Sequence, residues 1–298
     1  MMSKKIDGLF TANDLYDSVM DLYSGKSHVQ YKTGFDSLDP FLKIVKPCFT
    51  VITGTPNSGK SSFSYDLAMN LAKKEGFKFL IYSPEHSLAV NVKRLVEKYT
   101  KKPFDKMFNN RLKETELGEA IVFIDKHFFF MDKLHDSPDI DWIVERAYWC
   151  AENLKIDCLI IDPYNEINPN RNNGFREDEH ISVVISKIKR FNRETDTMSF
   201  LIAHPNKQIR NPDGKFVVDS LYSISGSAHF NNKADIGIIV TRDFELQQTD
   251  IRIAKVREID VYGNIGSVTL KWNPRQRCYN TLDEYESNYT IVGGNNIF

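Results

Sequence analysis

A run of eight residues from Gly54 to Ser61 has the spacing of a phosphate-binding loop. It reads Gly-Thr-Pro-Asn-Ser-Gly-Lys-Ser, which fits the pattern of two glycines, a lysine and a hydroxyl residue. Glycines let the backbone wrap around phosphates, and the N–H groups of the loop and of a following helix then face the anion. Lys60 would reach the β- and γ-phosphates, and Ser61 would ligate Mg²⁺. The residues expected to bind the nucleotide are Gly54, Thr55, Pro56, Asn57, Ser58, Gly59, Lys60, Ser61 and Ser62.

Polar residues also follow three other apolar runs. Asp162 ends the run Cys158–Ile161, where a charge is costly unless it serves an ion, so it is the candidate second Mg²⁺ ligand. Glu85 follows residues 79–83 and could deprotonate an attacking water. His204 follows residues 200–203 and could hydrogen-bond the terminal phosphate. The alternatives are a capping aspartate, a solvated glutamate and a structural histidine.

The elements that must position these residues alternate between two patterns. Short apolar runs predict strands and amphipathic stretches predict helices, which indicates an α/β fold with a mostly parallel sheet flanked by helices and antiparallel strands at its C-terminal edge. The strands are expected at 49–53, 78–83, 127–132, 157–162, 199–204, 235–241, 251–256 and 267–272. The helices are expected at 15–22, 61–74, 141–154 and 181–193. The aromatic run Phe128–Phe130 is interpreted as core and not as a base-stacking surface.

Composition sets limits on the function. The chain has 298 residues, 41% of them hydrophobic, and a net charge of −1, so any nucleic-acid contact must use a local patch. No apolar run reaches the ~20 residues of a membrane span, and no secretory signal is visible, so no membrane partner is expected. The four cysteines lie far apart and form no C-x-x-C pair, so a zinc ribbon or redox pair is not expected. Cys158 stands in an apolar strand pattern and is expected to be a small core residue, and this use of cysteine favours a reducing, cytoplasmic setting.

The order of short motifs resembles one family. The phosphate loop is followed by Ser-Pro-Glu at 83–85, Ile-Asp-Pro at 161–163, Ala-His-Pro at 203–205, Ser-Gly-Ser-Ala-His at 225–229 and Lys-Val-Arg at 255–257. This order is similar to that of the RecA-like P-loop NTPase domain of hexameric replicative DNA helicases, closest to the Twinkle and phage primase-helicase branch, over residues 30–280.

The resemblance implies roles for the matching residues. Glu85 matches the catalytic glutamate, Asp162 the Walker B aspartate, and His204 the residue that senses the γ-phosphate. Lys255 and Arg257 match a cationic pair supplied across a subunit interface, with Arg257 as the arginine finger. Without the resemblance, the pair reads as exposed cations on an edge strand that discourage aggregation.

Two polar loops are implied to touch single-stranded DNA in the channel of a ring, which the family forms as a hexamer. Lysine and arginine neutralise phosphates without reading sequence. The expected DNA-binding residues are Arg171, Arg176, Asn206, Lys207, Arg210 and Lys215. Ordinary solvated loops are the alternative, and Ser225–His229 receives no chemical role.

The expected organisation is a linker-helix region at 1–30, a RecA-like ATPase domain at 31–285 and a polar tail at 286–298. The expected function is an ATP-dependent DNA helicase of 5′–3′ polarity that acts in replication, with a primase or polymerase as a possible partner. With no room for a primase ahead of the phosphate loop, the chain is expected to be a stand-alone motor or a fragment, of a form that suits a phage or mobile element. Two other classes stay open: a recombination or regulatory ATPase of RecA type that assembles on ATP without unwinding, and a nucleotide-gated scaffold.

Overall fold

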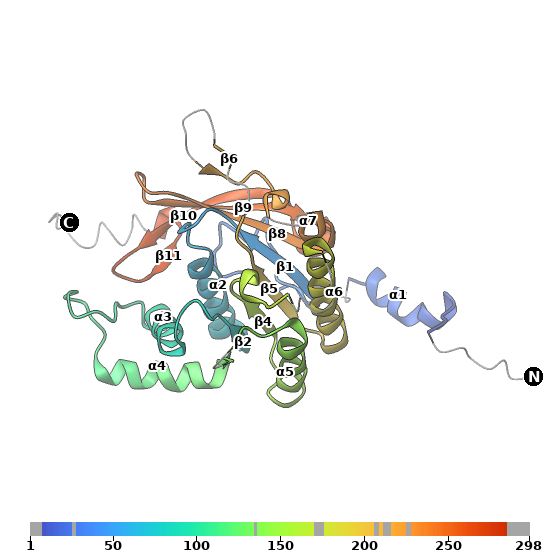
Figure 1. Ribbon diagram of the computed structural model, residues 1–298, viewed down its shortest axis with the longest axis horizontal. Helices are drawn as coiled ribbons and strands as arrows, with labels where there is room; N and C mark the ends of the chain where they lie inside the picture. The colour runs from blue at the N-terminus through green and yellow to red at the C-terminus, as the bar shows by residue number, and fades with distance from the viewer. Residues whose placement is uncertain are drawn as a thin grey trace, which may run out of the picture.

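A nine-stranded sheet is the centre of the computed structural model (Figure 1). The structure describes residues 8–25, 28–133, 136–169, 176–205, 209–210, 216–224 and 228–284. The strand order is β11-β10-β9-β8-β1-β5-β4-β2-β3. The five consecutive strands from β1 to β3 pair in parallel. They are β1 (Cys48–Thr53), β5 (Met198–Ile202), β4 (Cys158–Ile161), β2 (Phe79–Tyr82) and β3 (Phe128–Met131).

The C-terminal strands extend this sheet on the other side of β1. β8 (Ile236–Asp243) is parallel to β1, and then β9 (Gln248–Val256), β10 (Gly266–Asn273) and β11 (Cys278–Asn280) run antiparallel in turn. The mostly parallel sheet with antiparallel C-terminal strands is therefore confirmed. Because β9 lies between β8 and β10, the reading of Lys255 as an edge-strand cation is wrong.

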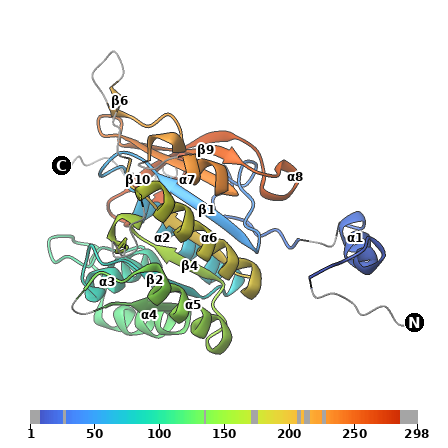
Figure 2. The same ribbon diagram turned by 45° about the vertical axis from the view of Figure 1, so that its right-hand side comes forward.

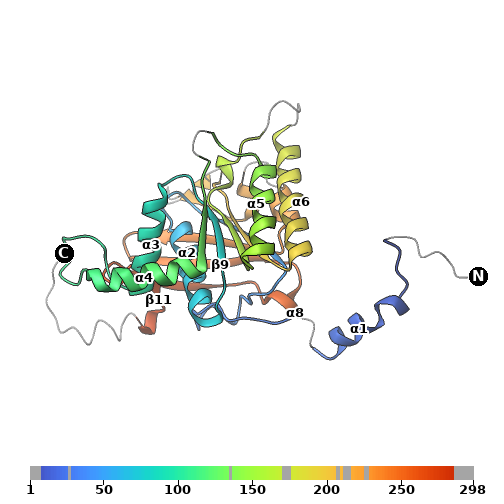
Figure 3. The same cartoon turned by 90° about the horizontal axis from the view of Figure 1, so that it is seen from below.

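Helices cover both faces of the sheet (Figure 3). One apolar core lies under α2 (Lys60–Glu75), α3 (Leu88–Thr100) and α4 (Glu114–His127), and a second lies under α5 (Ile140–Asn153), α6 (Glu177–Thr195) and α7 (Ala228–Lys233). The inner strands are apolar throughout because both of their faces are buried. Each loop that leaves the carboxyl end of a parallel strand therefore opens at one rim of the sheet.

Smaller elements stand outside this core. The helix α1 (Tyr16–Tyr23) has no buried residue and lies apart from the body of the molecule (Figure 2). The short strands β6 (Ile209–Arg210) and β7 (Phe216–Val217) form a hairpin that projects beyond the sheet, and α8 (Ile259–Tyr262) follows β9. The 286–298 tail lies outside the described residues.

Most expected elements are present, but the strand expected from His127 to Asp132 begins one residue late. His127 is the last residue of α4, whose helical hydrogen bonding continues through the N–H of Phe128 to Ile124 O. The phenylalanine run is confirmed as core, since Phe128 is buried and Phe129 and Phe130 pack against the two opposite cores. The helices α3 and α4 are not among the elements expected from the sequence. In α3 the charged residues Lys93, Arg94, Glu97 and Lys98 obscure the apolar face.

Candidate nucleotide site and a cationic cluster at the opposite end of the strands

The phosphate loop joins the end of β1 to the start of α2, as the sequence predicts. Gly54 and Gly59 have φ values of 153° and 93°, which side chains rarely adopt. A Cβ on Gly54 would lie 2.0 Å from Val240 O, and one on Gly59 would lie 2.0 Å from the Tyr279 hydroxyl. Only glycine can therefore occupy these two positions without displacing β8 or β11.

Lys60 lies inside the loop that it is expected to serve. Its Nζ donates to Gly54 O and Thr55 O, both at 3.0 Å, and the side chain is buried. Burial lowers the pKa of Lys60, and the negative charges of Asp162 and Glu85 oppose that shift. The ammonium group is thus held by weak neutral acceptors, which phosphate oxygens can replace.

Asp162 and Ser61 meet where a magnesium ion would sit beside the phosphates. Asp162 is 3% exposed, and its carboxylate accepts a hydrogen bond from Ser61. Burial raises the pKa of Asp162, the Ser61 bond opposes the rise, and Glu85 adds to it. A hydroxyl and a carboxylate are the oxygen ligands that Mg²⁺ prefers, with the other positions left to water and phosphate. The described part of the chain holds no group of three or more His, Cys, Asp or Glu side chains that could hold a metal ion.

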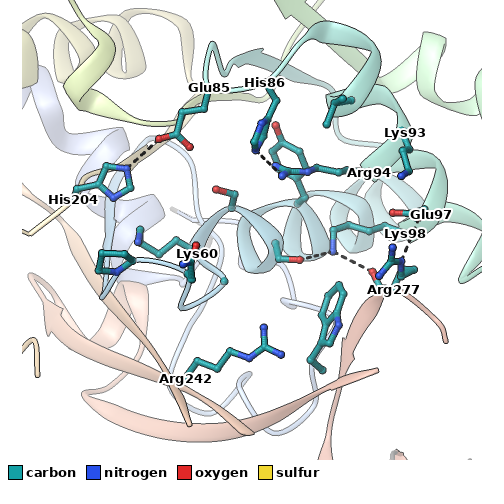
Figure 4. Close-up of a pocket in the computed structure, with 18 of the residues that line it drawn as sticks. Lys60, Glu85, His86, Lys93, Arg94, Glu97, Lys98, His204, Arg242 and Arg277 are labelled. Atoms are coloured by element: carbon teal, nitrogen blue, oxygen red, sulfur yellow. Dashed lines mark hydrogen bonds and ion pairs between the residues drawn. The ribbon is translucent and has the colours of Figure 1, made fainter. Parts of the chain in front are cut away.

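Glu85 and His204 lie next to each other beside the phosphate loop and line the same cavity as Lys60 (Figure 4). His204 Nε2 lies 3.2 Å from Glu85 Oε1, and the two side chains are 37% and 40% exposed. Asn91, buried on α3, donates to Ser83 O and His86 O and so fixes the backbone on both sides of Glu85. Glu85, the candidate general base, is therefore partly exposed to solvent, while hydrogen bonds from Asn91 hold the backbone of its loop in place.

A cavity of about 710 Å³ extends from the loop toward α3 and the C-terminal strands. Six of the nine predicted loop residues line this cavity. The other three, Gly54, Thr55 and Ser58, do not line it, and the Ser58 N–H donates to Thr55 O within the loop. Sequence reasoning missed the far wall, which consists of Arg94, Lys98, Arg242, Trp272 and Arg277. The helix α3 carries Arg94 and Lys98 to the cavity. The strand order brings Arg242 of β8 and Trp272 of β10 there from distant parts of the chain, which no local pattern could have revealed.

Lys98 links the elements of this wall through a buried ion pair. Its Nζ lies 2.9 Å from Asp66 Oδ1, and both side chains are about 5% exposed. Lys98 also donates to Ser62 Oγ at 3.2 Å and lies over the Trp272 ring at 5.2 Å from its centroid. The phosphate-loop helix, α3 and β10 are therefore connected by one cation.

Lys255 and Arg257 are not in this cavity. Arg257 Nε lies 2.8 Å from Asp235 Oδ1, and Asp235 accepts the N–H of Phe49 near the start of β1. The phosphate loop follows Thr53 at the other end of β1. A strand rises about 3.3 Å per residue, so the four residues from Phe49 to Thr53 alone separate the two ends by ~13 Å. The cationic pair and the phosphate loop of one chain thus lie at opposite ends of the parallel strands: the pair lies at the amino end of β1 and the loop at its carboxyl end.

The expected DNA-binding residues are only partly described. Arg176 precedes α6, is 74% exposed in its side chain and pairs with Asp178 at 2.6 Å. Arg210 is exposed on the projecting β6–β7 hairpin. Arg171, Asn206, Lys207 and Lys215 lie outside the described residues, as do residues 225–227 of the Ser-Gly-Ser-Ala-His motif.

With this geometry in place, comparisons with known proteins assign the class. A family model described as DnaB-like helicase C terminal domain matches residues 31–281, and the chain belongs to that family. The ATPase domain of G40P superimposes with a TM-score of 0.75 at 19% identity, covering 93% of this chain and all of the other. A structure described as a DnaB-like replicative helicase and its interactions with primase gives a TM-score of 0.70 at 20% identity, over 93% of this chain and 68% of that one. The RecA-like fold is therefore confirmed.

Two relatives found by sequence comparison indicate which members of this helicase family the chain is similar to. The Twinkle homolog protein of Arabidopsis thaliana, described as chloroplastic/mitochondrial, is 36% identical over 285 residues, which are 91% of this chain and 40% of that protein. A probable plasmid replicative DNA helicase of Chlamydia psittaci is 23% identical over 252 residues, 81% of this chain and 53% of that protein. The resemblance to the Twinkle branch is thus confirmed. The chain spans about half or less of the length of these relatives.

Proposed function

We propose that this chain is the motor of an ATP-driven replicative DNA helicase that hydrolyses ATP between neighbouring copies in a ring. The observation that carries the proposal is the separation of Arg257 from the phosphate loop of its own chain. Hydrolysis spreads charge over the equatorial oxygens of the phosphate, and an arginine placed there accelerates the reaction by about 10³–10⁵. Because Arg257 cannot reach its own loop, a complete site needs a second copy.

Residues at the carboxyl rim of the sheet supply the remaining chemistry. The loop backbone and Lys60 hold the phosphates, and Ser61 and Asp162 hold Mg²⁺, which neutralises charge on the β- and γ-phosphates. Glu85 orients water and accepts its proton, as its position and its 3.2 Å contact with His204 allow. His204 senses the terminal phosphate, because a phosphate oxygen would compete with Glu85 for its ring N–H.

The far end of the cavity fits the nucleobase. Trp272 offers an aromatic face and Arg242 a planar cation, and both line the same space as the phosphate loop. Aromatic and guanidinium planes stack on every base without requiring one identity. This wall supports ATP as a substrate and tolerates other nucleoside triphosphates.

The DNA contacts are proposed for the loops above the rim. Arg176 and Arg210 are described and exposed there, and Arg171, Asn206, Lys207 and Lys215 belong to the same two loops of the sequence. A ring repeats a weak patch around one strand, which accommodates the net charge of −1. We further propose a hexamer, 5′–3′ movement, an intracellular site of action, and primase as a partner, as named for one structural neighbour. No helix in the described ranges is long and apolar enough to cross a membrane.

Unwinding of a forked duplex with a single-stranded tail tests this function. Strand separation is expected with Mg-ATP, and neither with a non-hydrolysable analogue nor in the Lys60→Ala variant. DNA-stimulated ATP turnover without strand separation would instead favour the alternative, a RecA-type ATPase that assembles without unwinding. Nucleotide-dependent assembly without turnover would favour the scaffold.

A further inference from the structure

One buried carboxylate, Asp235, holds together the cationic cluster at the amino end of β1, the end away from the phosphate loop. Asp235 precedes β8 and is only 10% exposed in its side chain. Its Oδ1 lies 2.8 Å from Arg257 Nε and 2.6 Å from Lys189 Nζ, which comes from α6. Its Oδ2 accepts the Phe49 N–H at 3.0 Å. The carboxylate is therefore fixed to β1 by one oxygen and holds two cations by the other.

Backbone carbonyls at the end of α7 complete the holding site. Arg257 Nη2 donates to Asn232 O at 2.8 Å and to Ala234 O at 3.3 Å. Lys255 Nζ donates to Asn231 O, and Lys189 Nζ donates to Lys233 O at 2.9 Å. Carbonyls at the C-terminal end of a helix carry partial negative charge and are well suited to cations. All three cations thus contact the end of α7, and two of them, Lys189 and Arg257, also contact Asp235.

The arrangement fixes the orientation of Arg257 without burying it. The side chain of Arg257 is 41% exposed, while its carboxylate partner is 10% exposed. A free arginine on the surface samples many rotamers, and ordering its long side chain costs conformational entropy. Contacts that use Nε and Nη2 restrict the guanidinium plane before any partner arrives. Preorganisation of this kind matters because a misplacement of about 1 Å in a catalytic group can cost ~10²-fold in rate.

We propose that Asp235 is a positioning residue: with the carbonyls of α7, it presets Lys255 and Arg257 for the phosphates bound by a neighbouring copy. This inference rests on the proposed function, because it takes Arg257 as the finger. Asp235 does not line the nucleotide cavity of its own chain. It acts on Arg257 by direct contact and on Lys255 through its negative charge. Its effect is therefore on turnover at the neighbour's site and not on nucleotide affinity at its own.

A purely structural role is the competing explanation, since Asp235 also tethers the start of β1. The chain offers a matched control in Asp157, which precedes β4. Asp157 Oδ1 accepts from Lys46 Nζ at 2.7 Å, and Asp157 Oδ2 accepts the Lys78 N–H at 2.9 Å. It therefore joins a lysine and a backbone N–H as Asp235 does, but has no contact with the cationic pair.

The first test compares Asp235→Asn with Asp157→Asn. An asparagine oxygen can still accept the N–H of Phe49, whereas its NH₂ group cannot hold Arg257. We expect Asp235→Asn to lower the kcat of DNA-stimulated ATP hydrolysis by about 10²-fold, with the KM for ATP unchanged. Asp157→Asn should keep the wild-type kcat. Asp235→Glu retains the charge and should give an intermediate rate, which keeps the test informative if the asparagine variant fails to fold.

The second test uses mixed rings. Lys60→Ala subunits have an inactive pocket but an intact finger. In a 1:1 random mixture with Asp235→Asn, about a quarter of the interfaces combine an intact pocket with an intact finger. Turnover should therefore exceed the sum of the two separate variants, and an Arg257→Ala mixture with Lys60→Ala should behave in the same way.

The outcomes separate this inference from the proposed function. Wild-type kcat in Asp235→Asn, or a loss of ATP affinity equal to its loss of kcat, overturns the positioning role. So does rescue of Arg257→Ala by Lys60→Ala without rescue of Asp235→Asn. If Arg257→Ala itself retains full turnover, the intersubunit finger of the proposed function fails, and the positioning role fails with it.

Discussion

His204 Nε2 and Glu85 Oε1 lie 3.2 Å apart although 119 residues separate them in the sequence. His204 follows β5 and Glu85 follows β2, and the strand between these two is β4, which ends at Asp162. The pair therefore bridges over the strand that carries the magnesium-ligand candidate. Strand order, and not sequence distance, brings these three polar groups together beside the loop that follows β1.

Replacing the general-base candidate should separate turnover from binding. Glu85→Gln keeps the shape of the side chain but cannot accept a proton, so kcat should fall by about 10²–10⁴, while ATP affinity is retained. Steady-state hydrolysis and nucleotide titration measure the two quantities. Glu75→Gln, at an exposed position at the end of α2, is the control and should behave as wild type. Retained turnover in Glu85→Gln would remove its role.

Asp162→Asn should abolish hydrolysis and yet stabilise the nucleotide-free protein. Burial raises the pKa of the Asp162 carboxyl, so folding penalises the charged form. This penalty develops as the pH rises from the unfolded-state pKa of Asp162 to its higher folded-state pKa, and it is complete above the folded-state pKa. Neutral asparagine avoids this penalty, so the free energy of unfolding of the nucleotide-free protein should rise.

Thermal unfolding without Mg²⁺ and nucleotide measures this difference between Asp162→Asn and wild type. With Mg-ATP the order should reverse, since a charged carboxylate binds the ion more strongly than a neutral amide does. A lower Tm for Asp162→Asn in the absence of ligand would mean that attraction to Lys60 outweighs the burial cost.

Lys98→Met should strongly destabilise the chain. It leaves Asp66 buried without its cation, and burial already raises the pKa of Asp66. Breaking a buried pair by removing one partner costs about 3–5 kcal/mol. Urea denaturation without nucleotide measures the loss. Lys102→Met breaks the partly exposed pair with Glu116 and serves as the control, with no measurable change expected. Equal stability of the two variants would contradict the prediction.

Hydrolysis should weaken as the pH rises above about 8. Burial, and then the charge of Arg257, lower the pKa of Lys255 to about 8. Lys189 lowers it further and Asp235 opposes the shift, while Asn231 O accepts from the amine. Because the shift is downward, Lys255 loses its charge at a lower pH than an ordinary lysine. Its attraction to the neighbour's phosphates fades over that range.

Rates of hydrolysis between pH 7 and pH 10 at saturating ATP test this prediction, with Lys255→Arg as the comparison. Arginine stays charged throughout, so its profile should lack the alkaline fall. Stability moves the other way, because the unfolded chain binds more protons than the folded chain between the two pKa values of Lys255. An alkaline loss of turnover that coincides with unfolding would therefore not come from Lys255.

Local sequence patterns are enough to predict the phosphate loop and the polar residues at the strand ends. Gly54, Gly59 and Lys60 are specified by backbone freedom and charge within eight residues, and Asp162 is specified by an acid after a buried run. α3 was missed because its inward face is partly polar, with Asn91, Glu97 and Lys98 buried there. Those residues serve the cavity instead of the apolar core, so hydrophobic periodicity could not reveal them.

The sequence by itself determined the class of chemistry, because a phosphate-binding loop and a strand-end acid are short-range patterns. Only the tertiary structure decided which groups meet. The order β8-β1-β5-β4-β2 joins Glu85 to His204 and carries Arg242 to the cavity. The same order leaves Arg257 beside Asp235 at the amino end of β1, away from the cavity. Pairing between distant strands sets these distances, and no local propensity encodes it.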